Sequence, residues 1–297
     1  MLEFIFARDM VVNPRKIYRR PTRRRYLSPP SRPPPPPPLR RHASSVQNFL
    51  KQVEETKTNI GPYLNLYQVH SATFDSGILT NTIVHDAMHR LCRIENGWDI
   101  GLSVSGPDQD ELIREALGVL VPAPEEEDDD DDGNEPPRRL FDSVQCTYNI
   151  LEQRPAQALL EAHANGVDVI IKEGLANGRA LLHPRLLELA RSLDCEPDML
   201  ALGAVLSQPF MPRVLSGAVS VEQLRSNMGS LYYPRMSAKN GGNGGDVRTL
   251  ETSSRHLGVE EILTSTKEGR DGLRRLMSEC RMESEEYWKD RSNLRWN

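Results

Sequence analysis

The stretch from residue 142 to residue 181 decides the fold, and it reads DSVQCTYNILEQRPAQALLEAHANGVDVIIKEGLANGRAL. Two runs rich in β-branched and apolar residues, 142–148 and 167–171, flank a segment whose apolar residues recur at helical spacing. Gly166 ends this helix because glycine tolerates the left-handed conformation that follows many helices. The run 167–171 is too apolar to have a face in water, which favours a parallel strand buried on both sides.

The same alternation of strand and helix recurs along the chain. Strands are predicted to begin near residues 63, 98, 142, 167 and 212. Helices are predicted at about 46–57, 81–95, 107–120, 184–193, 197–207, 220–228 and 270–280, and in the segment that holds the apolar residues 158, 159, 162 and 164. Five strand–helix units indicate an α/β fold with a parallel sheet, which we interpret as an incomplete (β/α)8 TIM barrel, because a closed barrel needs eight units.

Composition divides the chain into three parts. Residues 1–43 alternate arginine clusters with proline and are predicted to be a disordered basic arm. Residues 44–230 hold the partial barrel, interrupted at 122–137 by a run of glutamates and aspartates that predicts a solvated surface loop. Residues 231–297 are predicted to form a flexible Gly/Asn-rich loop followed by a C-terminal helical tail.

Charge is distributed unevenly along the chain. The net charge is −5, yet residues 1–45 hold eleven Arg or Lys against two acidic residues, so the remaining residues carry about −14. An acidic folded part argues against nucleic-acid binding, and the absence of an apolar run of about 18 residues argues against a membrane span. Four cysteines without a close pair and the lack of a secretory pattern predict a cytoplasmic protein, with organelle targeting by the basic arm left open.

Polar residues are expected to follow the strands at the edge where parallel α/β folds gather functional groups. Lys172 follows an apolar strand and is either a nucleophile that forms a Schiff base or a partner of Glu173 or another carboxylate at the strand end. His70 is either a catalytic donor or a structural group. His85 and His89 are spaced like metal ligands on a helix, but no third ligand is evident, so we expect a helix surface and no metal site.

Together these segments resemble the aldo/keto reductase family, and the order of the motifs is more specific than any one of them. The resemblance rests on residues 66–70 (LYQVH), 101–103 (GLS), 144–145 with Asn149, 172–178 (KEGLANG), 216–218 with 222–224 and Asn227, and 287–288. It implies a (β/α)8 barrel that reduces aldehydes or ketones with a nicotinamide cofactor.

The resemblance also implies roles for individual residues. His70 matches the histidine that donates to the substrate carbonyl, and Ser103 and Gln145 match residues that hold the nicotinamide carboxamide. Lys172 stands where many members have an aromatic ring stacked on nicotinamide. The residues that match the pyrophosphate and adenosine end are Ser216, Gly217, Gln223 and Asn227. Because Gly217 and Gln223 replace the Lys and Arg that bind a 2′-phosphate in many members, the cofactor is NADP or NAD.

We therefore expect an aldo/keto-reductase-like oxidoreductase that acts on a small carbonyl substrate. The Asp, Tyr and Lys of the family's catalytic tetrad match no segment of residues 1–43, so the partial barrel is expected to lack its first three units. Two alternatives stay open: a non-catalytic NAD(P)-binding or regulatory protein on the same fold, and a Schiff-base lyase that uses Lys172. Exposed barrel edges also predict an oligomer.

Overall fold

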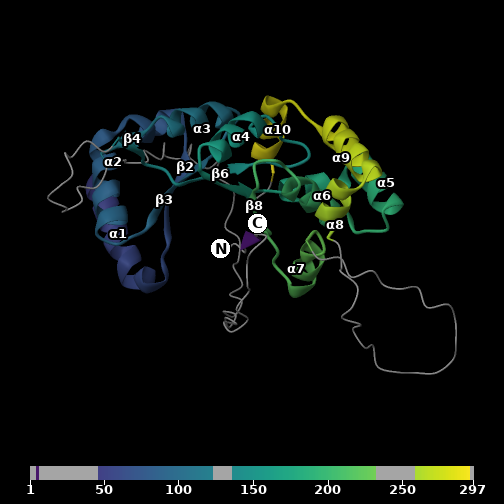
Figure 1. Ribbon diagram of the computed structural model, residues 1–297, viewed down its shortest axis with the longest axis horizontal. Helices are drawn as coiled ribbons and strands as arrows, with labels where there is room; N and C mark the ends of the chain where they lie inside the picture. The colour runs from purple at the N-terminus through teal and green to yellow at the C-terminus, as the bar shows by residue number, and fades with distance from the viewer. Residues whose placement is uncertain (1–4, 7–45, 123–135, 232–257, 295–297) are drawn as a thin grey trace, which may run out of the picture.

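Figure 1 shows the computed structural model of the chain, which describes residues 5–6, 46–122, 136–231 and 258–294. Most of the basic arm, nearly all of the acidic insertion and the Gly/Asn-rich loop lie outside the described residues. The predictions for those three segments therefore stay predictions.

The centre of the fold is a six-stranded sheet in the order β1-β8-β7-β6-β3-β2. Its five parallel strands are β2 (Leu66–Ala72), β3 (Asp99–Val104), β6 (Ser143–Thr147), β7 (Asp168–Lys172) and β8 (Arg213–Leu215). These are the five strands that the sequence predicts, in the predicted order. The α/β fold with a parallel, barrel-like sheet is confirmed.

The two faces of this sheet differ in chemistry. The register places Ile100 and Leu102 of β3 beside Val144 of β6 and Val169 of β7, and all are at most 2% exposed. Because side chains alternate along a strand, the other face carries a polar set. It comprises Gln68, Ser103, Ser143, Gln145 and Lys172. An apolar face under helices and a polar inner face are what a barrel wall requires.

Helices follow the strands as expected. They are α1 (Val46–Ile60), α2 (Thr82–Met88), α3 (Gln109–Leu117), α4 (Ala156–Ala164), α5 (Pro184–Ser192), α6 (Pro197–Leu206), α7 (Val221–Met228), α8 (Val259–Ser265), α9 (Lys267–Cys280) and α10 (Ser284–Ser292). Figure 1 shows α2, α3 and α4 in a row along one side of the strands, with α7 on the other side. A π-helical segment, His89–Ile94, continues α2.

The segment that decides the fold behaves as predicted. Leu159 on α4 is fully buried, and Gly166 has a φ of 77°, which is the left-handed conformation that ends the helix. Val169 and Ile170, which point to opposite faces of β7, are each 2% exposed, as a strand covered on both faces requires. The strand–helix–strand unit is confirmed.

Two short pairings were not expected. Strands β4 (Leu120–Val121) and β5 (Arg138–Arg139) pair antiparallel and close the base of the acidic insertion. Strand β1 (Ile5–Phe6), within the basic arm, pairs antiparallel with β8 and extends the sheet. The sequence gives no sign of β1, β4 or β5, because a strand of two residues is too short to show an alternation of apolar and polar residues.

Two buried clusters hold the fold together. The larger packs the apolar face of the sheet against α2, α3 and α4, and includes Leu102, Ile113 and Leu159. The smaller joins α5 and α6 to the C-terminal helices through residues such as Leu200 and Tyr287. No described helix has the length and apolar character needed to cross a membrane.

Candidate functional site

The predicted site residues lie at the carboxyl edge of the sheet. Ser103, Gln145 and Lys172 come from the adjacent strands β3, β6 and β7. Ser216 and Gly217 follow β8, and Gln223 and Asn227 lie on the next helix, α7. Parallel strands bring their carboxyl ends to one edge, and this edge is where ligands bind in α/β folds.

A hydrogen-bonded chain links the three strand-end residues. The Ser103 hydroxyl donates to Gln145 Oε1 at 2.9 Å, and Lys172 Nζ donates to Ser103 Oγ at 3.2 Å and to Ser105 Oγ at 2.8 Å. Ser103 is 2% exposed, whereas Gln145 and Lys172 are half-buried. The edge therefore offers a cation and an amide beside buried hydroxyl groups.

Glu173, one of the carboxylates suggested as a partner of Lys172, is bound by the C-terminal helix α10. Arg291 of α10 forms a two-pronged ion pair with the Glu173 carboxylate, with Nε at 2.9 and 2.8 Å from the two oxygens and Nη2 also in contact. The Tyr287 hydroxyl donates to the same carboxylate at 3.4 Å. Glu173 has a φ of 56°, so its backbone is left-handed and the regular strand conformation of β7 ends at Lys172.

The Tyr287 hydroxyl belongs to a buried network around this ion pair. Asn149 Nδ2 donates to the Tyr287 oxygen at 3.1 Å and to the Glu173 carbonyl at 2.9 Å. Arg179 stacks over the Tyr287 ring with its guanidinium carbon 4.2 Å from the ring centre. Burial raises the pKa of the Tyr287 hydroxyl, and the Glu173 carboxylate acts in the same direction. This phenol therefore stays protonated as a fixed donor.

The loop after β8 is held by its own side chains. Asn227 Nδ2 donates to the Ser216 carbonyl at 3.2 Å and to its hydroxyl at 2.9 Å. The Ser216 hydroxyl accepts from the Ala218 backbone N–H, and Gln223 Oε1 accepts from the Val219 N–H at 2.9 Å. The predicted binding residues thus shape this loop, and Gly217 adopts a φ of 62° within it.

A cavity of about 380 Å³ opens beside this loop. Ser216, Gly217, Gln223 and Asn227 line one side, and Glu196 and Asp198 at the start of α6 line another. Among the described residues, no Lys or Arg lines it, and no ion pair involves Glu196 or Asp198. The rest of the lining is mainly apolar, with Leu175, Leu181, Pro197 and Ala218, so the cavity is largely apolar and carries two carboxylates.

His70 lies apart from the linked residues. It is exposed at the end of β2, and its Nε2 is 3.5 Å from the Ser71 hydroxyl. The pairing of β2 with β3 is irregular between Val69 and Ala72, where Ser71 has a φ of 52°. The strand end that delivers this imidazole is therefore distorted, and the ring faces solvent.

The expectation that His85 lies on a helix surface is wrong. His85 is 5% exposed, and its Nε2 lies 2.5 Å from the Ile78 carbonyl oxygen. It therefore packs in the core as a satisfied polar group.

Sequence reasoning missed several participants. Ser105 follows Ser103 by two residues, so alternation along the strand was a signal that both hydroxyls share a face. The spacing of Tyr287 and Arg291 by four on one helix was a weaker signal for a shared partner. Gln109 is fully buried; it donates to the Thr147 carbonyl at 3.2 Å and accepts from the Thr147 N–H at 2.8 Å. No local sequence pattern predicts this contact.

Comparison with known proteins gives a structural match alone. No protein-family model matches the sequence, and no curated protein matches it either. The apo form of an aldo-keto reductase from Bacillus halodurans superposes with a TM-score of 0.50 over 80% of this chain and 71% of that chain, at 19% identity. The chain therefore has an aldo-keto-reductase-like fold.

Two further solved structures are similar at lower scores. The holo form of the Bacillus halodurans enzyme gives a TM-score of 0.49 at 19% identity, over 79% of this chain and 68% of that one. A thermostable aldo-keto reductase in complex with the inhibitor epalrestat gives 0.45 at 23% identity, over 61% of this chain. The chain spans 60% of the length of that thermostable enzyme.

Proposed function

We propose that the chain binds a nicotinamide dinucleotide at the carboxyl edge of the sheet and acts on a small carbonyl compound. The observation that carries this proposal is the linked set Ser103, Gln145 and Lys172 at three adjacent strand ends. The cavity beside Gly217 lies along the same edge. Its volume falls within the range of about 300–1,000 Å³ typical of small-ligand sites.

The residues present fit a nicotinamide dinucleotide. A carboxamide needs neutral donors and acceptors, which Ser103 and Gln145 supply, and a ribose needs acceptors for its hydroxyl groups. Glu196 and Asp198 are such acceptors, because carboxylates bind ribose hydroxyls in NAD sites, whereas a 2′-phosphate requires a cation. We therefore propose NAD(H) in preference to NADP(H), since two carboxylates repel the extra phosphate.

The chemistry divides between the cofactor and the chain. When bound, the cofactor supplies a hydride to the carbonyl carbon. Gln145 and Ser103 would orient the ring, and His70, whose ring faces solvent at the end of β2, is the chain's candidate donor to the carbonyl oxygen, where negative charge develops. A positioned acid contributes about 10² to 10⁴-fold, and the family's Tyr and Lys have no match in this chain. We therefore expect turnover lower than that of a complete aldo-keto reductase by about this factor.

Fluorescence titration with NADH and NADPH tests the proposal. The chain should bind NADH more tightly than NADPH, Gln145→Ala and Asn227→Ala should weaken binding, and His70→Ala should leave binding unchanged. Arg274→Ala on the exposed face of α9 is the matched control. Failure of the parent chain to bind either nucleotide would refute the proposal.

The Schiff-base alternative is tested separately at Lys172. Lys172 Nζ already donates hydrogen bonds to the Ser103 and Ser105 hydroxyls, which hold it at the strand ends, so we expect no adduct. Incubation with small aldehydes, borohydride reduction and mass spectrometry provide the measurement. A stable adduct at Lys172 that is lost in Lys172→Ala would favour the lyase.

A further inference from the structure

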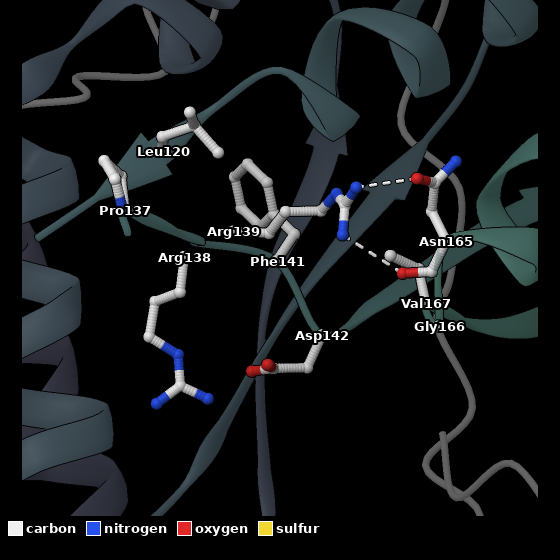
Figure 2. A pocket seen from close by; sticks show the side chains of 9 residues that line it. All are labelled: Leu120, Pro137, Arg138, Arg139, Phe141, Asp142, Asn165, Gly166 and Val167. Carbon is white, nitrogen blue, oxygen red and sulfur yellow. Dashed lines mark hydrogen bonds between the residues drawn. The ribbon is translucent and has the colours of Figure 1, made fainter. Parts of the chain in front are cut away.

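A second cavity lies at the opposite edge of the sheet, where β6 and β7 begin (Figure 2). Its volume is about 330 Å³, and its lining includes Arg138, Arg139, Phe141, Asp142 and Asn165. In barrel folds this amino-terminal edge normally serves stability, and ligands bind at the other edge. A charged cavity here therefore calls for its own explanation.

The carboxylate in this cavity is already neutralised. Arg93 Nη2 donates to Asp142 Oδ2 at 2.5 Å, and the Ile100 backbone N–H donates to the same oxygen at 2.8 Å. Arg93 is largely buried and also donates to the carbonyls of Arg139 and Leu140, at 3.2 and 2.9 Å. Asp142 is thus committed to Arg93 and cannot serve as the counter-charge for another arginine.

Arg139 is held in place by uncharged groups. Its Nη1 donates to the Asn165 carbonyl at 3.1 Å, and its Nη2 donates to Asn165 Oδ1 at 2.7 Å, as Figure 2 shows. The Asn165 amide is itself oriented, because its Nδ2 donates to the Glu161 carbonyl at 2.8 Å. Arg139 Nε is buried and has no hydrogen-bond partner. The guanidinium is therefore preorganised while its charge is not paired.

Arg138 adds a second cation at the rim. It is exposed, and Figure 2 shows it extending away from Asn165. No carboxylate among the described residues pairs with Arg138 or Arg139. The pKa of nearby His89 is lowered first by burial and then by the charges of Arg93 and Arg138.

We propose that this cavity binds a small phosphate-class anion, either inorganic phosphate or a phosphate monoester. Arg139 is the fixed ligand. The neutral oxygens of Asn165 hold its guanidinium in place, and the guanidinium can donate to a phosphate oxygen in addition to these acceptors. Arg138 swings in as the second ligand, which its exposed long side chain permits. Phe141, 2% exposed, forms an apolar wall that suits the organic part of an ester.

Isothermal titration with inorganic phosphate and with phenyl phosphate tests this site on the full chain. Arg139→Met should weaken binding roughly 10- to 100-fold, because a hydrogen bond to a charged group contributes that much. Asn165→Asp should abolish binding while keeping the local shape, since it places a carboxylate on the Arg139 guanidinium. Arg274→Met, which removes an exposed arginine from α9, is the charge-matched control and should bind as the parent does.

Two outcomes identify the source of the phosphate. Equal affinity for both probes assigns the site to the phosphate group alone, whereas tighter binding of phenyl phosphate assigns it to an ester that contacts Phe141. Binding that persists unchanged in Arg139→Met and Asn165→Asp would place the anion on the basic residues 1–45 and overturn the proposal.

The acidic run between β4 and β5 provides a further comparison. In the sequence, the eight acidic residues 125–132 connect β4 to β5, and residues of both strands line the cavity. Negative charge close to an anion site opposes binding. Replacing these residues by Gly and Ser should tighten phosphate binding, most strongly at low salt. Absence of binding in both the parent and this variant contradicts the proposal.

Discussion

At the scale of single residues, the candidate site is built from hydrogen bonds that cross between strands. Ser103, Gln145 and Lys172 lie between 27 and 69 residues apart in three successive strands of the sheet, and the sheet register brings them together. Their positions at strand ends were predictable from the sequence. Ser105 as a partner of Lys172 and Arg291 as the partner of Glu173 were not, because such pairings depend on side-chain direction after the backbone is folded.

The choice between the two cofactors is predicted to depend on Asp198. Asp198→Lys replaces a carboxylate at the cavity by a cation, so NADPH affinity should rise roughly three- to tenfold relative to NADH. Competitive fluorescence titration at two salt concentrations measures the ratio, and the gain should shrink at high salt. An Asp194→Lys variant, four residues earlier in the connection between α5 and α6 and outside the cavity lining, is the control. An equal shift in both variants would mean a general charge effect.

The buried thiol Cys92 should make stability fall at alkaline pH. Burial raises the pKa of Cys92 to about 12 and that of Tyr67 to about 12. Above pH 9 the unfolded thiol ionises while the folded one stays protonated, so the unfolded state binds fewer protons and stability declines. Each such group should cost up to about 1.4 kcal/mol per pH unit. Urea unfolding between pH 8 and 11 measures the free energy of unfolding, which should fall less steeply with pH in Cys92→Ala than in the parent chain. Identical slopes in the two chains would contradict a raised pKa at Cys92.

At the scale of elements, the five parallel strands and the helices between them were predictable. Each shows a regular spacing of apolar residues or ends at a residue that breaks the element, such as Gly166. The β4–β5 pair and β1 were not, since two-residue strands carry no period. The helix after β2 was predicted as one α-helix over 81–95, yet it changes to a π-helical segment at His89. The switch from α-helix to π-helix changes the backbone hydrogen bonds but not the spacing of apolar residues in the sequence, so the sequence pattern does not reveal it.

The C-terminal helix α10 should be fixed mainly by the Arg291–Glu173 ion pair. The Glu173 side chain is 12% exposed, so Arg291→Ala leaves a nearly buried carboxylate unpaired and should cost about 3–5 kcal/mol. Arg291→Ala with Glu173→Gln should recover most of this loss, because the double change removes both charges. Urea denaturation measures the difference. The control Arg274→Ala, at an exposed pair, should cost at most about 1 kcal/mol.

At the scale of the whole molecule, the described sheet is open. Strand β2 pairs with β3 alone and β1 with β8 alone, so the two outer strands do not meet among the described residues. The partly apolar β2 has half-buried residues along most of its length. Unpaired strand edges invite pairing with another chain, which supports our proposal that the protein oligomerises through this edge.

Leu66→Lys tests that proposal because a lysine on an edge strand opposes edge-to-edge pairing. Light scattering coupled to size exclusion should show the parent above the monomer mass and the variant shifted towards the monomer. Ile94→Lys, which changes an exposed apolar residue away from the edge, should leave the mass unchanged. A parent chain that is monomeric at all concentrations would contradict edge pairing.

The central claim is that the carboxyl edge of this sheet holds a nicotinamide dinucleotide. A crystal structure of the full chain grown with NADH tests it most directly. We predict that the nicotinamide carboxamide contacts Gln145 and Ser103, and that the adenosine half occupies the cavity between Gly217 and Asp198. A nucleotide bound with its phosphates on Arg139 at the opposite edge, or crystals that take up no nucleotide at saturating NADH, would contradict the account.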